Sequence, residues 1–251
     1  VFTDEMLTWP PDPDAWSLRW YKNMIGNCSA DVVSSTVPCS NKWMIGTVNS
    51  FFIGFVATFI ATTLGTLAAL GLSRPHMPYK GLIMAILISP MIVPLIITAA
   101  GMFFFYARIN LVYSFTGIIL AHVALATPFV VITVTATLVG FDMNMVKASQ
   151  SLGARPVRTF FKVIMPLILP GVISGALFAF ITSFDEVVIV MFMASLDQLT
   201  IPKQMWAGIR QEISPVILCM ATCLVILSIL LLTTVELLRR RSEKLRGIKS
   251  R

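Results

Sequence analysis

The chain has 251 residues, of which 57% are hydrophobic and only 12% are charged, and its mean hydropathy is +0.84. A soluble domain carries about 25% charged residues, so this composition excludes an ordinary soluble domain and indicates a membrane protein. The formal net charge of +7 is a weak argument for a nucleic-acid partner. The basic residues lie in loops and in the C-terminal tail, which is typical of membrane topology and of contact with anionic lipid headgroups.

Five apolar stretches are each long enough to cross a bilayer, for which about 20 residues suffice. They cover residues 43–72, 81–106, 111–140, 167–194 and 213–238. A helix satisfies its own backbone groups within one segment, and alternating β-barrel patterning is absent, so we expect an all-α polytopic bundle. The expected domains are an external segment at 1–42, a transmembrane domain at 43–238 and a basic tail at 239–251.

The distribution of Lys and Arg sets the expected orientation. Most of these residues lie in the loops 73–80 and 141–166 and in the tail 239–251, which the positive-inside rule places in the cytoplasm. Five spans then put the N-terminus outside. Segment 1–42 is polar and has no signal peptide, so we expect a preceding span that is missing from this chain. A genuine five-span protein is the alternative.

The sequence contains no catalytic, metal-binding or ATP-binding pattern. A Gly-rich phosphate loop is absent, and no Cys/His cluster has metal-ligand spacing, so we expect no cofactor, no metal and no enzymatic activity in this chain. Cys28 and Cys39 share the outer segment, where a disulfide and free thiols are both open. Cys219 and Cys223 are four residues apart, which suits packing on one helix face. For His122, within a span, an interhelical hydrogen bond is favoured over proton relay.

The charged loop 141–166, between two apolar spans, contains the clearest local pattern. Asn144 suits a helix N-cap, two turns of helix follow, and Gly153 suits the left-handed residue that ends them. Arg155-Pro156 then blocks the helix and starts a new element. The apolar residues at helical spacing are Met145, Ala148 and Leu152. We expect a short surface helix with one apolar face, which either rests on headgroups or docks on a partner.

This loop resembles the signature loop of permease subunits in ABC importers, which reads Glu-Ala-Ala, three residues, Gly, nine residues, Ile-x-Leu-Pro. The corresponding residues here are Lys147-Ala148-Ser149, Gly153 and Val163-Ile164-Met165-Pro166. The Gly and Pro spacing is met in full, whereas Lys replaces Glu, Ser replaces the second Ala, Val replaces Ile and Met replaces Leu. The similarity runs from about Trp20-Tyr21 through the last span and includes residues 89–94, 128–133, 140–142 and 183–188.

The resemblance implies a type I ABC-importer permease, in which this loop forms coupling helices that dock in a groove on the nucleotide-binding subunit. It implies ATPase-coupling roles for Lys147, Ala148, Ser149, Leu152, Gly153, Arg155 and Pro166. With Asn144 as cap, a Glu at position 147 would complete a capping box, whereas a cation there is unfavourable by roughly 0.3–1 kcal/mol. We therefore expect that Lys147 meets an acidic group on its ATPase, or that a second permease subunit carries the intact Glu.

Two adjacent acids, Asp185 and Glu186, lie in the apolar part of a span, where an ionised Asp costs roughly 2.5–3.5 kcal/mol. Adjacent helical residues point about 100° apart, so we expect one acid to line a pathway and the other to hold a neighbouring helix or subunit. Two structural hydrogen-bond partners are the alternative. Acids without an intramembrane cation favour a cationic substrate. Phe184 and Tyr106 are further candidates for the substrate path, Tyr106 through a cation–π face, although packing also explains the aromatic run 103–105.

Residues 183–188 are also similar to the matching segment of spermidine/putrescine-type permeases, which implies polyamine import. Neighbours of that subfamily carry opines, aminobutyrate and other small amines or amino acids, which are the alternatives. The family also implies a place in the bacterial inner membrane with a cytoplasmic C-terminus. A secondary transporter is the competing class, but the sequence has no internal repeat.

The resemblance further implies the partners. They are two ATPase subunits that bind ATP and Mg²⁺, a second permease subunit that is usually a distinct chain, and an external substrate-binding protein. The binding protein would face the outer segments 1–42 and 196–212.

Overall fold

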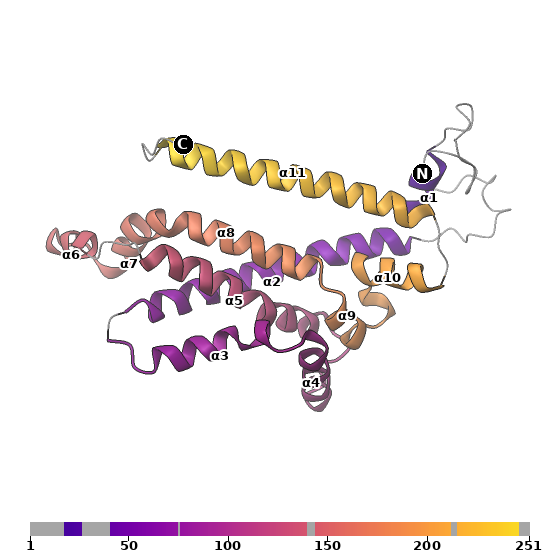
Figure 1. Ribbon diagram of the computed structural model, residues 1–251, viewed down its shortest axis with the longest axis horizontal. Helices are drawn as coiled ribbons and strands as arrows, with labels where there is room; N and C mark the ends of the chain where they lie inside the picture. Colours follow the sequence, from indigo (N-terminus) through magenta and orange to yellow (C-terminus); the bar gives the residue numbers. More distant parts are fainter. Residues whose placement is uncertain (1–17, 27–40, 75, 140–143, 212–214, 246–251) are drawn as a thin grey trace. The chain divides into compact units, whose positions relative to one another are not determined.

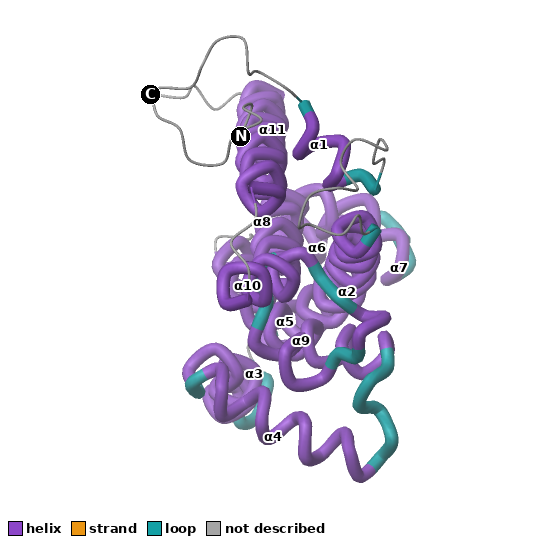
Figure 2. The backbone as a smooth tube through the Cα atoms, turned by 90° about the vertical axis from the view of Figure 1, so that its right-hand side faces the viewer, coloured by secondary structure: helices purple, strands orange, loops and turns teal. Residues whose placement is uncertain are grey.

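The computed structural model describes residues 18–26, 41–74, 76–139, 144–211 and 215–245. In these residues every regular element is helical, which confirms the all-α class (Figures 1 and 2). The chain divides into two compact units, one made of residues 1–50 and 199–251 and the other of residues 51–198. Most of the external segment 1–42, with Cys28 and Cys39, lies outside the described residues, so the expected domain boundaries remain predictions.

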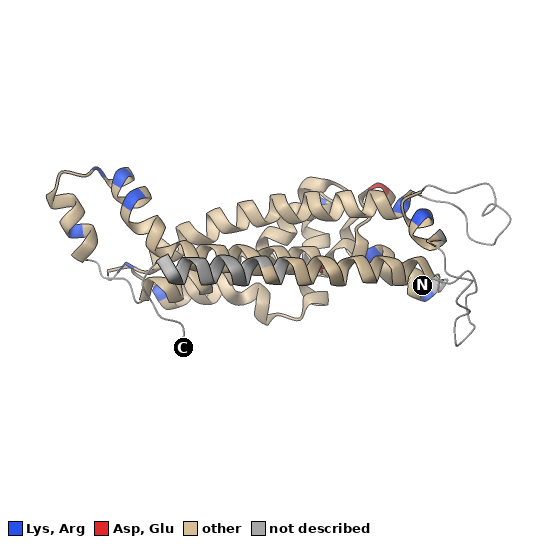
Figure 3. Cartoon of the chain, turned by 90° about the horizontal axis from the view of Figure 1, so that it is seen from above, with Lys and Arg blue, Asp and Glu red and all other residues tan. Residues whose placement is uncertain are grey.

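Among the described residues, three helices are long and apolar enough to cross a membrane. They are α2 (Lys42–Leu72), α5 (Phe115–Val139) and the run Pro156–Phe184, which comprises α7 (Pro156–Thr159), the π-helix η3 (Phe160–Ile164) and α8 (Met165–Phe184). Helix α11 (Pro215–Leu245) contains a shorter apolar stretch, Pro215–Leu230, within its described residues. All four overlap predicted spans, although the run Pro156–Phe184 begins and ends earlier than the predicted span at 167–194. Helix α8 itself contains no charged residue (Figure 3).

The predicted span at 81–106 is broken in two. Helix α3 (Lys80–Ile92) and helix α4 (Leu95–Arg108) meet at an angle of 103°, which makes them either one broken span or a re-entrant pair. Val93 has an extended backbone with ψ of 136° because the ring of the following Pro94 disfavours a helical conformation there. The single span expected at 81–106 is therefore divided by a complete break at Pro94.

The core of the 51–198 unit forms where α5 packs along α8 (Figure 1). Small residues allow this close approach, as is common between membrane helices. A Cβ atom added to Gly175 of α8 would lie 3.0 Å from the Cα of Val130 in α5. A Cβ added to Gly65 of α2 would lie 2.7 Å from the Cβ of Val130. Three helices therefore meet around one short segment of α5.

The unit of residues 1–50 and 199–251 has its own small core. Helix α1 (Arg19–Met24) packs on α11, where Trp20, Val216 and Cys219 are buried together. Residues 42–50 of α2 also belong to this unit, and the Asn49 side-chain amide donates to the Leu199 carbonyl at 2.9 Å. The amphipathic helix α10 (Ile201–Gln211) follows Leu199.

Candidate functional site

The short helix predicted in the loop 141–166 is present as α6 (Asn144–Ser151). Its end is a Schellman motif, in which the Ala154 N–H donates to the Ser149 carbonyl at 3.1 Å and the Gly153 N–H donates to the Gln150 carbonyl at 2.9 Å. Gly153 has a φ of 79°, the left-handed conformation expected from the sequence. Asn144 is the first helical residue of α6, and the residues before it lie outside the described part of the chain.

Helix α6 is tied to the helical run that follows it. Arg155 is extended and Pro156 is the first residue of α7, as predicted. The Ser149 and Thr159 hydroxyls share a hydrogen bond of 2.9 Å, which joins α6 to α7. Pro166 cannot donate to the carbonyl of Lys162, and the π-helix η3 lies at this point, where the backbone departs from regular α-helix.

The predicted apolar face of α6 is open to its surroundings. The side chains of Leu152 and Met145 are 88% and 47% exposed, Ala148 is also exposed, and none of the described residues of α6 is buried. Lys147 is exposed as well, and its carbonyl accepts a hydrogen bond from the Ser151 hydroxyl at 3.0 Å. Helix α6 lies beyond the ends of α5 and α8, among the Lys and Arg residues of the loop (Figures 1 and 3). An exposed apolar face on a well-anchored short helix is suited to contact with another protein.

The predicted continuous helix over 167–194 is wrong at the two acids. Helix α8 ends at Phe184, and α9 (Val188–Met193) begins three residues beyond Asp185. The buried Glu186 accepts a hydrogen bond from the Ile189 N–H at 2.8 Å through Oε1, so its side chain caps the start of α9. A side chain that bonds the local backbone in this way competes with helix continuation.

The two acids therefore have different environments. Asp185 is exposed, whereas Glu186 is only 7% exposed and is held against α9. Glu186 thus holds the start of a neighbouring helix, as expected of one of the two acids, while the role of Asp185 in a substrate path stays a prediction. Their separation comes from the break between α8 and α9, and not from their spacing on one helix.

His122 of α5 is bonded to the last turn of α8. Its Nδ1 lies 2.8 Å from the Ser183 hydroxyl, which confirms the expected interhelical hydrogen bond. The His122 side chain is 1% exposed, and its Nε2 has no hydrogen-bond partner in the part of the chain that the structure describes. The bond fixes α8 to α5 two residues before Asp185.

The two aromatic candidates for the substrate path lie in different places. Phe184 packs with Phe180 and Phe51, with ring centroids 5.4 and 5.2 Å apart. Tyr106 is half-buried in α4, which packs against α9, the helix that follows the acids. The structure thus places Phe184, Asp185 and Glu186 at the break between α8 and α9. Tyr106 lies on α4, which contacts α9.

A second constrained turn was not predicted from the sequence. Tyr113, between α4 and α5, is exposed and has a φ of 59°. Its N–H donates to the Met193 carbonyl at 2.9 Å, and its carbonyl accepts from the Gln198 side chain at 2.7 Å. Neither partner is close in sequence, so no local pattern could have identified this turn.

The titratable groups add little evidence about the function of the site. Outside the spans, partial burial lowers the pKa of the Lys203 ammonium in α10. Within the described ranges, no group of three or more His, Cys, Asp or Glu residues is placed to hold a metal ion.

These helices and their exposed connecting helix define a multi-pass membrane protein of the permease class. Residues 61–244 match the family described as "binding-protein-dependent transport system inner membrane component", and the chain belongs to this family. Members of this class are transport components and not enzymes.

Two relatives illustrate the similarity. The spermidine/putrescine transport system permease protein PotC of Escherichia coli is 30% identical over 190 residues, which cover 76% of this chain and 72% of that protein. PotC of Haemophilus influenzae is 28% identical over 228 residues, covering 91% of this chain and 84% of that protein.

Solved structures agree on the fold. Two structures of the MetNI methionine ABC transporter in inward-facing conformations match with TM-scores of 0.57 and 0.60 at 21% and 20% identity. They cover 82% and 86% of this chain and 95% and 100% of theirs.

Proposed function

We propose that this chain is the transmembrane permease subunit of an ATP-driven importer, and that it helps to form the path of a small cationic substrate, a polyamine such as spermidine or putrescine. The names of its curated relatives support the substrate, and the exposed carboxylate of Asp185 supports its charge. Opines, aminobutyrate and other small amines are the alternative substrates.

The observation that carries this proposal is the anchored, exposed helix α6. Leu152 and Met145 present apolar surface without cover from the described chain, and full burial of a Leu side chain is worth about 1.5–3 kcal/mol. The Schellman motif and the Ser149–Thr159 bond attach α6 to α7. A partner that grips α6 can therefore move the helical run as a rigid body.

The partner is an ATPase subunit, which binds the ATP and Mg²⁺ that this chain does not bind itself. In the complete importer, two such subunits pair with this permease and with a second, distinct permease chain. An external binding protein delivers the substrate to the outer segments, and the tail 239–251 lies in the cytoplasm of a bacterial cell. Ala148, Gly153, Arg155 and Pro166 shape the coupling helix and its elbow, while Lys147 contacts an acidic group of the ATPase.

In the proposed substrate path, at the break between α8 and α9, Asp185 contacts the cation during passage and Glu186 positions α9. The aromatic faces of Phe184 and Tyr106 contribute contacts to a desolvated cation. Replacement of Asp185 removes one favourable charge from the path, while a change at Glu186 also disturbs the start of α9.

The test is ATPase stimulation of the reconstituted complex by a panel of amines, each with the cognate binding protein. We expect stimulation by spermidine or putrescine, a loss of at least ten-fold in uptake for Asp185→Asn, and partial recovery in Asp185→Glu. Normal uptake in Asp185→Asn would contradict the role of the carboxylate. Stimulation by a neutral amino acid alone would contradict the polyamine assignment.

A further inference from the structure

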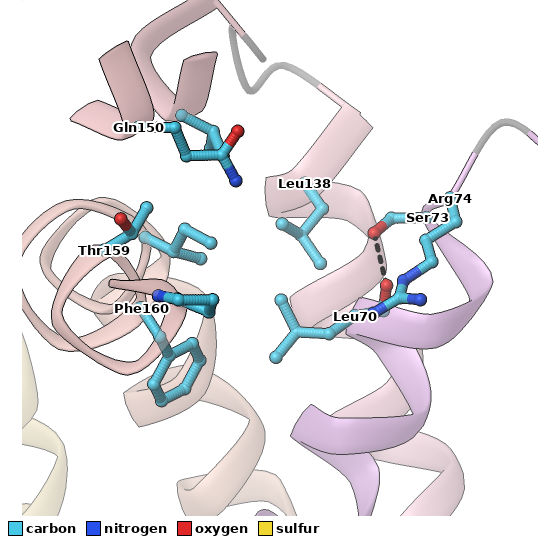
Figure 4. A pocket seen from close by; sticks show the side chains of 10 residues that line it. Leu70, Ser73, Arg74, Leu138, Gln150, Thr159 and Phe160 are labelled. Carbon is cyan, nitrogen blue, oxygen red and sulfur yellow. Dashed lines mark hydrogen bonds between the residues drawn. The ribbon is translucent and has the colours of Figure 1, made fainter. Parts of the chain in front are cut away.

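A cavity of about 340 Å³ lies within the 51–198 unit, on the side of α6 that faces the bundle (Figure 4). The last turn of α2, the end of α5, helix α6 and the start of the α7–η3 run form its walls. A water molecule occupies about 30 Å³ of liquid, so the cavity has room for on the order of ten groups of that size. That space suits a phosphate with several attached carbons.

The described polar lining contains no acid, and its donors for a ligand are the Arg74 guanidinium and the Gln150 amide. The Ser73 hydroxyl donates to the Leu70 carbonyl, and the Thr159 hydroxyl is hydrogen-bonded to Ser149. In Figure 4, Arg74 and Ser73 lie on one side and Gln150 and Thr159 on the other. Arg74 and Gln150 are both exposed, and within the described residues neither the Arg74 guanidinium nor the Gln150 side-chain amide has a hydrogen-bond partner. A guanidinium beside an amide donor, with no carboxylate among the described lining residues, favours an anionic ligand with several acceptor oxygens.

The rest of the wall is apolar. Leu70, Leu138, Phe160 and Ile164 face the same space, so a fully hydrated anion would leave much of the lining against water. Leu70 and Leu138 lie in the last turns of α2 and α5, two helices that are long enough to span a bilayer. The cavity therefore lies at the ends of two candidate spans, which is the position that a site for a lipid headgroup requires.

We propose that this cavity binds a membrane phospholipid, with its phosphate on Arg74 and Gln150 and the first part of one chain against Phe160 and Leu138. Arg74 forms charge-assisted hydrogen bonds to the phosphate oxygens. The bound lipid contacts the end of α2, helix α6 and the α7–η3 run together. It therefore favours one position of α6, the coupling helix. This inference requires only that the chain is embedded in a membrane, and it is independent of the substrate.

The experiment is native mass spectrometry of the complete transporter complex, delipidated and then supplied with phosphatidylglycerol. We expect the complex to retain the lipid, and Arg74→Gln to lower its apparent affinity roughly ten-fold or more, because a charge-assisted bond is lost. Lys80→Gln is the matched control, since Lys80 is an exposed cation at the start of α3 and does not line the cavity. Arg74→Lys should recover part of the affinity.

Two further arms test the location and the source of the phosphate. Leu138→Trp should fill the apolar part of the cavity and weaken lipid retention while Arg74 is intact. Soluble glycerol phosphate should not compete with phosphatidylglycerol, because it lacks the chain that contacts the apolar wall. Equal lipid affinity in Arg74→Gln and Lys80→Gln would overturn the proposal, and effective competition by glycerol phosphate would overturn the assignment to a lipid. Recovery of each variant as an intact complex shows that a loss of lipid is not a loss of folding.

Discussion

Truncation of Leu152 is the sharpest test of the coupling helix. The Leu152 side chain is 88% exposed, so Leu152→Ala should change the free energy of unfolding of this chain by less than about 0.5 kcal/mol. If the side chain is buried in a pocket of the ATPase, the three lost carbons are worth about 0.8 kcal/mol each. The sum, about 2.4 kcal/mol, corresponds to a decrease of roughly 60-fold in affinity for the ATPase.

The assay measures the affinity of the detergent-solubilised permease for its ATPase subunit, together with thermal unfolding of the permease. Ile92→Ala is the matched control, because Ile92 is 74% exposed at the end of α3 and loses the same number of carbons. We expect a large loss of affinity for Leu152→Ala and almost none for Ile92→Ala. Equal affinities of the two variants would refute the docking role, and a large loss of thermal stability in Leu152→Ala would refute the exposed position of its side chain.

Three other changes test the packing and the site. Gly175→Leu should lower stability by about 1–3 kcal/mol, because its Cβ meets the α5 backbone, and thermal unfolding should show no such loss for Gly101→Leu, where nothing lies within 4 Å. Ser183→Ala leaves the buried Nδ1 of His122 unpaired and should cost about 1–3 kcal/mol; retention of full stability would mean that the bond contributes nothing. Lys147→Glu should reduce ATP-driven transport if the lysine meets an acidic ATPase group, and unchanged transport with unchanged ATPase coupling would exclude that contact.

The coupling loop could be predicted from the sequence because its structure is determined locally. Gly153 permits the left-handed turn. Pro156 favours an extended conformation of Arg155 before it and is the first residue of α7. The exposed positions of Met145 and Leu152 also follow from a helix that projects beyond the bundle. The proposed ATPase partner is outside this chain, so the sequence indicates the exposed face but not what contacts it.

The break between α8 and α9 could not be predicted because it depends on where one side chain points. A Glu in an apolar stretch can face a cavity or bond the backbone, and the composition of the segment is the same in both cases. The effect of a proline within an apolar stretch is similarly ambiguous from the sequence. Pro90 and Pro128 remain inside helices, whereas Pro94 separates α3 from α4 by 103°. The sequence alone does not separate these cases, because packed membrane helices tolerate internal proline.

The π-helix between α7 and α8 affects the register of the long span. A π-turn accommodates one more residue than an α-turn, and each residue of an α-helix turns the chain by about 100°. Deletion of one residue within Phe160–Ile164 would therefore turn the π-helix into a regular α-helical turn and leave the direction of α8 almost unchanged. The same deletion a few residues later, inside α8, would rotate Gly175 away from α5 by about 100°, so this short segment is the place where the long span tolerates a change in chain length.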